Sequence, residues 1–227
     1  MTRWLAWAGM IRWVEEPGTL GGGTGNDTFI ATVGDGNDSY AGNGGTDTYS
    51  LATTTADAIV NLAAGSASSS QTGSDTLNSI EHVIGGAGND TITVSSSLNF
   101  LVGGAGSDTF VFASTSGAGN GANRDQITDF TSAADRIDLS GIDANGGQAG
   151  DPPFNFIGEV TNVVNGLDQL GRGQLGYHYE TDANGVEHTI IEGNINANAA
   201  ADFQIDLVGR LALSGNDFIF FEAERSL

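Results

Sequence analysis

The chain of 227 residues carries 28 acidic residues against seven basic ones, all arginine, and its formal net charge is −21 at pH 7. This charge argues against nucleic acid and against anionic membranes as partners. With 35 glycines, three prolines, no cysteine and 39% hydrophobic residues, the chain is neither collagen-like nor plainly disordered, and no disulfide can hold it together.

The N-terminal segment, residues 1–20, differs in composition from the rest because all three tryptophans lie in it. Trp4, Trp7, Ile11 and Val14 follow the spacing of one helix face, which predicts a short amphipathic helix that ends before Pro17. Such a helix could cover the open end of a repeat fold. Alternatively, the segment is a relic of an upstream domain or an appended sequence.

A nine-residue repeat begins at Gly22, where residues 22–30 match the pattern G-G-x-G-x-D-x-U-x, in which U is a large apolar residue. Two further units follow, each with one glycine missing. Asp27 and Asp47 occupy corresponding places twenty residues apart, so we expect them on one edge of the fold. Asp38 is expected on the opposite edge, with a partner from near Asp57.

Residues 51–72 contain no glycine–aspartate turn and predict a strand, a turn and a strand that continue the fold without metal. A second block of repeats follows at 85–93 and 103–111, whose aspartates, Asp90 and Asp108, lie eighteen residues apart. Asp75, in a half-motif before this block, is expected on the edge of Asp90. The large apolar residues recur every nine positions: Val83, Ile92, Leu101 and Phe110.

The residue types of the repeat suit a hard cation. Glycine allows the positive φ angles of a tight turn and leaves carbonyl oxygens open to an ion. Aspartate adds an anionic oxygen, and calcium takes six to eight oxygen ligands at roughly 2.3–2.6 Å. The x-U-x triplet predicts a three-residue strand whose middle side chain points inward. The alternative is a set of glycine and aspartate turns that bind nothing. Glu81 and Asn99 are expected together on the edge opposite Asp90 and Asp108, where we expect a weak or empty metal site.

The C-terminal part begins with a loop and a segment, 124–140, that is rich in turn acids. Asp125, Asp129, Asp135 and Asp138 could hold another calcium or cap their own turns. From residue 154 onward, alternating apolar and polar residues predict antiparallel strands, each buried on one face. These strands fall at 154–157, 174–179, 189–191 and 203–207, with a hairpin turn at 182–185.

The repeats resemble those of the RTX family of secreted bacterial proteins, and residues 124–220 resemble the C-terminal domain of serralysin-type proteases. The resemblance implies an all-β fold: a right-handed parallel β-roll with calcium between coils (21–112) and a C-terminal antiparallel cap (113–227). It also implies which groups bind each ion. Two successive turns would each contribute two backbone carbonyl oxygens and one aspartate carboxylate. The implied ligands are Gly22, Thr24, Asp27, Asn43, Gly45 and Asp47 in the first block, Gly85, Ala87, Asp90, Gly104, Gly106 and Asp108 in the second, and in addition Asp38 and Asp75.

No catalytic motif accompanies this resemblance. His82, His178 and His188 do not form the H-E-x-x-H motif of zinc proteases, and the chain has neither a G-x-S-x-G turn nor a cysteine nucleophile. No stretch approaches the roughly 20 apolar residues of a membrane span. We therefore expect a non-catalytic module of a secreted, extracellular protein, folded by calcium.

The expected partners are calcium ions, an upstream catalytic domain and a type I secretion machinery. The last is expected because residues 216–220 resemble the C-terminal signal that this system reads. One alternative is an adhesin or surface-layer unit that binds a glycan or a protein. An exposed aromatic cluster among Phe154, Phe156, Tyr177 and Tyr179 would favour it. Another is an accessory module of a secreted protease, lipase or alginate epimerase, although the charge of −21 opposes an anionic polysaccharide.

Overall fold

The computed structural model describes most of the chain, namely residues 11–12, 18–147, 152–161, 163–164, 167–168, 170–196, 198 and 200–221. It divides into two compact units. The first comprises Met1–Ser95 and Asn99–Thr109, and the second Ser96–Leu98 and Phe110–Leu227. Strands dominate both units, and the described helices have only three or four residues. The prediction of an all-β fold is confirmed.

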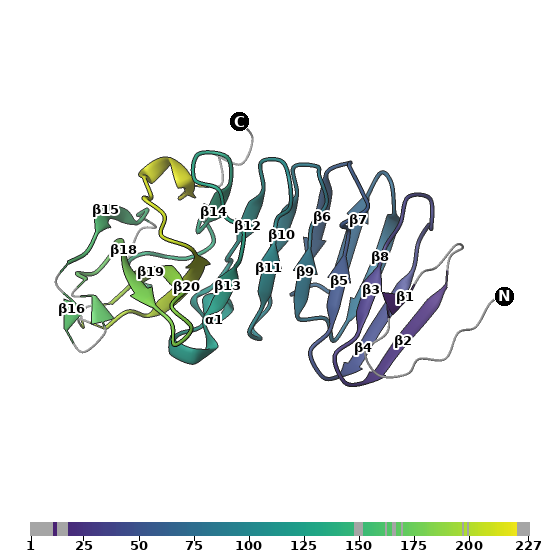
Figure 1. Ribbon diagram of the computed structural model, residues 1–227. Coiled ribbons are helices and arrows are strands. Elements are labelled where there is room, and N and C mark those ends of the chain that lie inside the picture. The colour runs from purple at the N-terminus through teal and green to yellow at the C-terminus, as the bar shows by residue number, and fades with distance from the viewer. Residues whose placement is uncertain are drawn as a thin grey trace. The chain divides into compact units, whose positions relative to one another are not determined.

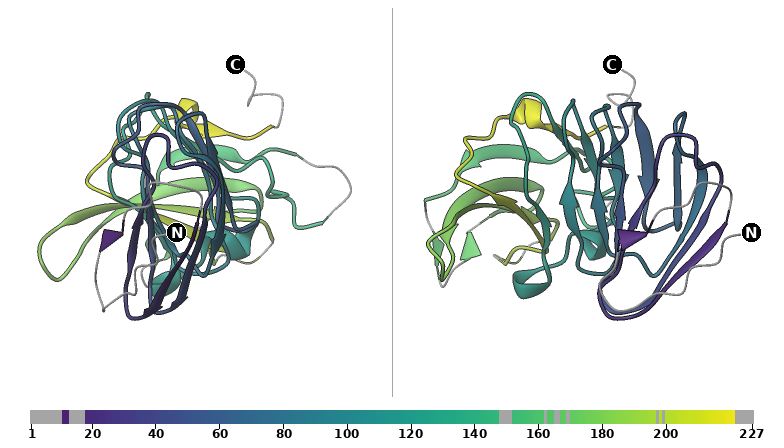
Figure 2. Two further views of the ribbon diagram at one scale, coloured as in Figure 1. Left: turned by 90° about the vertical axis from the view of Figure 1, so that its right-hand side faces the viewer. Right: turned by 45° about the vertical axis from the view of Figure 1, so that its right-hand side comes forward.

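The strands of the first unit form two sheets, whose strands are labelled in Figure 1 and which appear as two layers in the left view of Figure 2. One sheet is entirely parallel. Its strands, in order, are β1 (Ile11–Arg12), β3 (Thr28–Ile30), β5 (Thr48–Ser50), β9 (His82–Ile84) and β11 (Phe100–Val102). The other contains β2 (Thr19–Thr24), β4 (Ser39–Gly44), β8 (Gly73–Asn78), β7 (Ser66–Ser69), β6 (Ala58–Asn61) and β10 (Thr91–Thr93), in that order.

The segment between the two repeat blocks forms the predicted strand, turn and strand, but it does not continue the parallel coil. Strand β7 runs antiparallel to both β6 and β8. The turn between β6 and β7 contains Gly65, whose φ is +68°. Glycine is required there because a Cβ would lie 2.5 Å from the Leu77 carbonyl oxygen. Two strands are thereby inserted into one sheet, while β5 and β9 remain direct neighbours in the other.

The prediction of an N-terminal helix is wrong for Ile11–Arg12, the only part of the predicted helix that the structure describes. Ile11–Arg12 forms strand β1, which pairs in parallel with Thr28 and Phe29 of β3. Trp4, Trp7 and Trp13 lie outside the described residues.

The core of the first unit consists of the middle side chains of the short strands. The predicted nine-residue column is buried here: Val83, Ile92 and Leu101 have no exposed surface. The rings of Tyr40 and Tyr49 pack edge to face at 5.4 Å, and Phe29 lies 5.5 Å from Tyr40. Each fully buried large apolar side chain stabilises the fold by about 1.5–3 kcal/mol.

The second unit contains the strands predicted after residue 154, and most of its strands are labelled in Figure 1. Strands β18, β19 and β20 are antiparallel as predicted, but β15 pairs with β18 in parallel. The Asp182 N–H donates to Val186 O at 2.9 Å, which closes the predicted hairpin turn. The strands are β13 (Asp125–Ile127), β14 (Arg136–Asp138), β15 (Asn155–Glu159), β16 (Val163–Val164), β17 (Leu167–Asp168), β18 (Gln174–Thr181), β19 (Glu187–Asn194), β20 (Phe203–Val208) and β21 (Phe218–Ile219).

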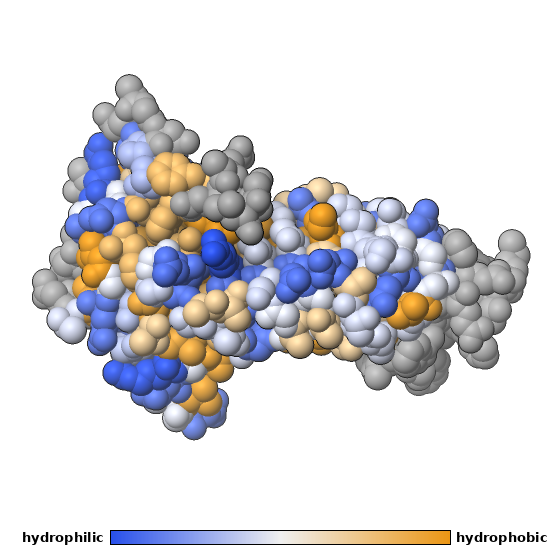
Figure 3. All heavy atoms as spheres, turned by 90° about the horizontal axis from the view of Figure 1, so that it is seen from above, coloured by the Kyte–Doolittle hydropathy of each residue, from blue (hydrophilic) through white to orange (hydrophobic). Residues whose placement is uncertain are grey.

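The remaining elements are short. Strand β12 (Thr109–Val111) spans the boundary between the units, followed by helix α1 (Thr115–Ala118) and the 3-10 turns η1 (Gly121–Asn123) and η2 (Gly215–Asp217). Within the described residues, no helix has the length and apolar character that crossing a bilayer would require. In the space-filling view (Figure 3), the visible face of the first unit is mostly hydrophilic or of intermediate hydropathy, with small apolar areas.

Candidate metal centres

The turns of the first unit stack along two edges. Those that lead into β3, β5, β9 and β11 form what we call the first edge, and their last residues are Asp27, Asp47, Glu81 and Asn99. The turns that precede the strands of the other sheet form the second edge. Their acids, in the order of the strands, are Asp38, Asp75 (which lies inside β8 rather than before it), Asp57, Asp90 and Asp108.

On the first edge, Asp47 and Glu81 each accept a hydrogen bond from the turn before them. The Asp27 N–H donates to Asp47 Oδ1 at 2.8 Å, and the Asp47 N–H donates to Glu81 Oε2 at 2.9 Å. Asn99 continues the series through its amide, which donates to the Glu81 carbonyl at 2.7 Å. The structure therefore brings Asp27 and Asp47 into adjacent turns, as the spacing predicts.

Asp27 and Asp47 are buried without enough hydrogen-bond donors. Their exposed fractions are 2% and 0%, and among the described residues neither oxygen of Asp27, nor Oδ2 of Asp47, has a hydrogen-bond partner. Burial raises the pKa of Asp47, the Asp27 N–H opposes the shift, and the charges of Glu81 and Asp27 add to it. Because a buried charge is costly unless it is paired, these oxygens fit a bound cation.

Glycines leave room beside these carboxylates. A Cβ on Gly22 would lie 2.5 Å from Asp27 Oδ2 and 2.9 Å from the Gly42 carbonyl oxygen. A Cβ on Gly45, at φ +130°, would overlap the Gly25 carbonyl oxygen. The predicted carbonyl ligands Thr24 and Asn43 belong to the paired strands β2 and β4, and Asn43 has a positive φ of 71°.

The Asp90 and Asp108 turns repeat this arrangement on the second edge. The Asp90 N–H donates to Asp108 Oδ1 at 2.8 Å, and glycine again permits the close approach. A Cβ on Gly85 would overlap the Gly103 carbonyl oxygen. In the same way, a Cβ on Gly104 would overlap the Gly86 carbonyl oxygen, and a Cβ on Gly106 would overlap the Gly88 carbonyl oxygen. The predicted ligand Ala87 lies in the same turn, and its N–H donates to the Thr54 carbonyl at 3.0 Å.

Asp90 differs from Asp27 in having donors for both oxygens. Oδ1 accepts from the Ala58 N–H and Oδ2 from the Gly86 N–H, each at 2.8 Å. Burial nonetheless raises the pKa of Asp90, while these two N–H groups oppose the shift. In this structure the Asp90 carboxylate is thus less dependent on a cation than that of Asp27.

Asp75 lies beside Asp38 rather than beside Asp90. The Asp38 N–H donates to Asp75 Oδ1 at 2.9 Å, and the Thr76 N–H donates to the Asp38 carbonyl at 2.8 Å. Asp57, the expected partner of Asp38, instead accepts the Asn89 N–H at 2.7 Å. The cause is the β6–β7 insertion, which places turn 52–57 between turns 70–75 and 85–90.

Two core tyrosines reach the Asp38–Asp75 pair, a role that the sequence did not suggest. The Tyr49 hydroxyl donates to Asp75 Oδ2 at 2.6 Å, and the Tyr40 hydroxyl to Asp38 Oδ2 at 3.4 Å. Burial raises the pKa of Asp75 to about 6, although the Tyr49 hydroxyl and the Asp38 N–H oppose the shift. Both tyrosines occupy the U position of the repeat, which indicates only an apolar ring.

A ladder of asparagine hydrogen bonds was also not predicted from the sequence. The side-chain oxygens of Asn26, Asn37 and Asn89 accept the N–H groups of Thr46, Ser74 and Ser107 in the next turn, at 3.0, 2.8 and 2.8 Å. Each asparagine directly precedes an aspartate of the repeat. The recurring Asn-Asp dipeptide was therefore the available signal.

An ion in these turns would need backbone oxygens. Within the part of the chain that the structure describes, no three acidic or histidine side chains converge as a metal site. Two carboxylates and several carbonyls from successive turns are the donor set that calcium accepts. The stacked turns, the glycine gaps and the buried oxygens of Asp27 and Asp47 therefore fit calcium.

The acids of the second unit mostly cap their own turns. Asp135 Oδ2 accepts the Thr131 N–H at 2.7 Å, and Asp138 Oδ1 accepts the Ser140 N–H at 2.9 Å. Asp125 is fully buried in β13, and Asp129 is half-buried. These contacts favour the capping interpretation for Asp135 and Asp138.

The histidines and aromatic residues of this unit are engaged in packing and ion pairs. His188 Nδ1 lies 2.7 Å from Asp206 Oδ1, and His178 Nε2 lies 3.3 Å from Glu180 Oε1. Phe154 and Tyr177 are each 5% exposed, and Phe156 and Tyr179 are half-buried. The aromatic cluster that would favour an adhesin is therefore not an exposed one.

Comparison with known proteins gives one family and a group of similar structures, which includes the two below. The family model for the peptidase M10 serralysin C terminus matches residues 24–220. The AlgE6R3 subunit of the Azotobacter vinelandii mannuronan C5-epimerase is 19% identical, with a TM-score of 0.43 over 92% of this chain and 85% of that one. The AlgE6R2 subunit is also 19% identical, with a TM-score of 0.40 over 91% of this chain and 93% of that one. No curated protein matches.

Proposed function

The chain belongs to the peptidase M10 serralysin C-terminal family, and from this premise we propose that it is a non-catalytic, calcium-binding module of an extracellular bacterial protein. Before export the chain stays largely unfolded and passes through a type I secretion system. Outside the cell, calcium binding drives it to fold, because the binding free energy becomes folding free energy. The same family membership supports a catalytic domain upstream of this module.

The observation that carries this proposal is the burial of Asp27 and Asp47 in adjacent turns. Three of their four carboxylate oxygens are buried without a hydrogen-bond partner among the described residues. The chain has no lysine and a net charge of −21, and no arginine side chain is described in the first unit. A calcium ion between the turns supplies the positive charge that this carboxylate pair lacks.

We assign the ligands of each ion to two successive turns. On the first edge, Gly22, Thr24 and Asp27 face Asn43, Gly45 and Asp47. On the second edge, Gly85, Ala87 and Asp90 face Gly104, Gly106 and Asp108, and Asp38 with Asp75 forms a further pair. Calcium neutralises the carboxylates and links the turns, so its role here is structural.

The three parts of the chain receive different roles in this proposal. Residues 21–112 are the calcium-binding roll, residues 1–20 are an N-terminal segment, and residues 113–227 are the serralysin-like C-terminal part. The acidic and apolar residues at 216–220 act as the export signal. The buried aromatic residues of the second unit give no support to an adhesin role for those strands.

Circular dichroism during a calcium titration tests the folding role. In chelator the chain should be largely disordered, and β-structure should appear at calcium concentrations on the order of 10⁻⁴–10⁻³ M. Magnesium at the same concentration is the control, because it demands a smaller octahedral site and keeps its waters. A calcium-free spectrum identical to the loaded one would overturn the proposal.

A further inference from the structure

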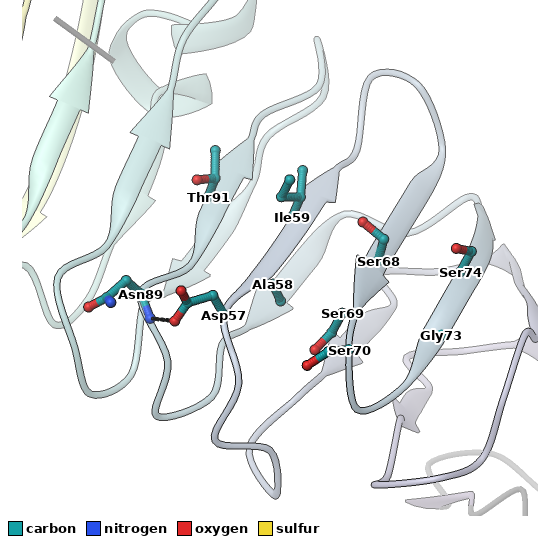
Figure 4. A pocket seen from close by; sticks show the side chains of 10 residues that line it. All are labelled: Asp57, Ala58, Ile59, Ser68, Ser69, Ser70, Gly73, Ser74, Asn89 and Thr91. Carbon is teal, nitrogen blue, oxygen red and sulfur yellow. Dashed lines mark hydrogen bonds between the residues drawn. The ribbon is translucent and has the colours of Figure 1, made fainter. Parts of the chain in front are cut away.

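The β6–β7 insertion interrupts the repeat and adds two strands to only one sheet of the first unit. In repeat proteins, insertions often form the binding face. A hollow of about 530 Å³ lies over this insertion (Figure 4). The insertion and the hollow thus point to the same surface.

Four neighbouring strands contribute one side chain each to this surface. Ser74 pairs with Ser68, Ser68 with Ile59, and Ile59 with Thr91 across β8, β7, β6 and β10. Figure 4 shows these side chains on the outer side of the sheet. We call this row, together with Asp57 and Asn89 at one end, the serine trough. Strands lie about 4.8 Å apart, so the row is regularly spaced.

The chemistry of the trough is polar and contains a single acid. Ser68 and Ser74 are exposed, and their hydroxyls can both donate and accept hydrogen bonds. Asp57 is exposed and receives the Asn89 N–H at 2.7 Å on one carboxylate oxygen. In the middle of the row, Ile59 is 60% exposed and offers an apolar surface. None of the described lining residues is basic.

These features select one class of ligand. A phosphate, sulfate or uronate group would meet Asp57 and a chain of charge −21 without a basic residue to bind it. A neutral sugar, by contrast, presents hydroxyl groups and an apolar ring face at once. We propose that the serine trough binds a neutral oligosaccharide or polysaccharide. Ile59 lies against a ring face, and Asp57, Ser68 and Ser74 hydrogen-bond to sugar hydroxyls.

Affinity electrophoresis of the full, calcium-loaded chain tests this site. Native gels containing dextran or hydroxyethyl cellulose provide neutral probes, and gels containing alginate provide an anionic comparison. At least one neutral polymer should retard the protein, and alginate should not. Retardation by neither neutral polymer, or by alginate alone, overturns the proposal.

A matched pair of variants locates the binding. Ile59→Ser should weaken the interaction by about fivefold, the scale of losing one apolar contact. Val33→Ser is the control, because Val33 is 61% exposed in the same unit but does not line the trough. Equal weakening in both variants would remove the trough as the site.

Two further readouts keep the outcomes distinct. Sedimentation velocity asks whether the face instead binds a second copy of this chain. A dimer that Ile59→Ser dissociates would replace the sugar proposal. Circular dichroism of the same samples reports calcium-dependent folding, so the loss of sugar binding with folding intact contradicts only this inference.

Discussion

A carboxylate oxygen buried without a donor is unusual, since the great majority of buried polar groups in proteins are hydrogen-bonded. Asp27 and Asp47 contribute three such oxygens within adjacent turns. Elsewhere on the same edges, comparable acids receive backbone N–H groups, as Asp90 does from Ala58 and Gly86. On the first edge two adjacent acids share such oxygens, so a cation has most to stabilise there.

Replacing Asp47 by asparagine should therefore weaken calcium binding at the first edge. The change removes one ligand charge, and we expect at least one site to lose about tenfold in affinity, or about 1.4 kcal/mol. Isothermal titration calorimetry measures the affinity, and the calcium midpoint of folding should rise in parallel. Glu159→Gln, on the exposed edge of β15, removes one charge outside the turns and serves as the control. Equal losses in both variants would indicate a general charge effect.

Two glycines with similar backbones separate crowding from conformational strain. Gly104 (φ +99°) would place a Cβ against the Gly86 carbonyl, whereas Gly23 (φ +103°) has nothing within 4 Å of that position. Gly23→Ala should cost about 1 kcal/mol through its φ alone. Gly104→Ala should cost more, because the stacked turns must move apart. Thermal unfolding in calcium measures both, and equal costs would mean that the turns are not so closely stacked in solution.

Among the elements, the turns and strands of the repeat could be predicted because their causes are local. A glycine–aspartate turn every nine residues determines where each short strand begins, and the apolar residue at its centre marks the core. The direction of β7 could not be predicted, since Ser66–Ser69 has no apolar alternation to indicate it. The partner of Asp75 depends on how many strands the insertion adds, which the sequence does not reveal.

The arrangement of the candidate metal sites could be predicted only in part, for a similar reason. The spacing brought Asp27 to Asp47 and Asp90 to Asp108, because these pairs follow the period of the coil. Tyr49 could not be found, since its hydroxyl contacts an acid 26 residues away. Its position in the repeat indicates an apolar ring alone.

The turns of the second edge should make the calcium-free fold sensitive to pH. Burial raises the pKa of Asp75 from 3.8 to about 6, and it also raises the pKa of Asp35 and Asp90. A raised folded-state pKa stabilises the fold at low pH, and this stability is lost as pH rises through that value. Without calcium, the chain should therefore be more folded near about pH 5 than near about pH 7.5.

Circular dichroism in calcium-free buffers measures this dependence. Tyr49→Phe removes a hydroxyl that lowers the pKa of Asp75, so it should move the pH midpoint upward. Tyr177→Phe, in the second unit, is the matched control. More structure at neutral than at acidic pH would contradict the assignment. Calcium competes with protons for the same oxygens, so the calcium affinity of the folded chain should fall as pH falls.

At the scale of the whole molecule, the two units differ in how local their contacts are. Strands β18 and β19 form a hairpin with a tight turn, whereas the parallel pairs of the first unit join residues seventeen or more positions apart. Local pairing is faster because it closes shorter loops. We therefore expect the C-terminal unit to fold first, with the repeats added coil by coil.

Truncation tests this order of folding. Deleting residues 124–227 should abolish calcium-induced β-structure although every full repeat remains, whereas deleting residues 1–20 should only lower stability. Circular dichroism and limited proteolysis in calcium compare the two truncations with the full chain. If residues 21–112 alone fold with calcium as well as the whole chain does, the C-terminal unit is not the nucleus.

The β6–β7 insertion also has a consequence for the shape of a calcium-binding isotherm. A stack of identical turns behaves as a one-dimensional lattice, in which each occupied site favours its neighbour. Here the glycine-free turn 52–57 stands between the Asp38–Asp75 pair and the Asp90–Asp108 pair. This turn interrupts the lattice, so calcium bound on one side of it changes the calcium affinity on the other side only weakly. Uptake along the second edge should then proceed in two shallow steps, each with its own Hill slope, instead of one steep transition.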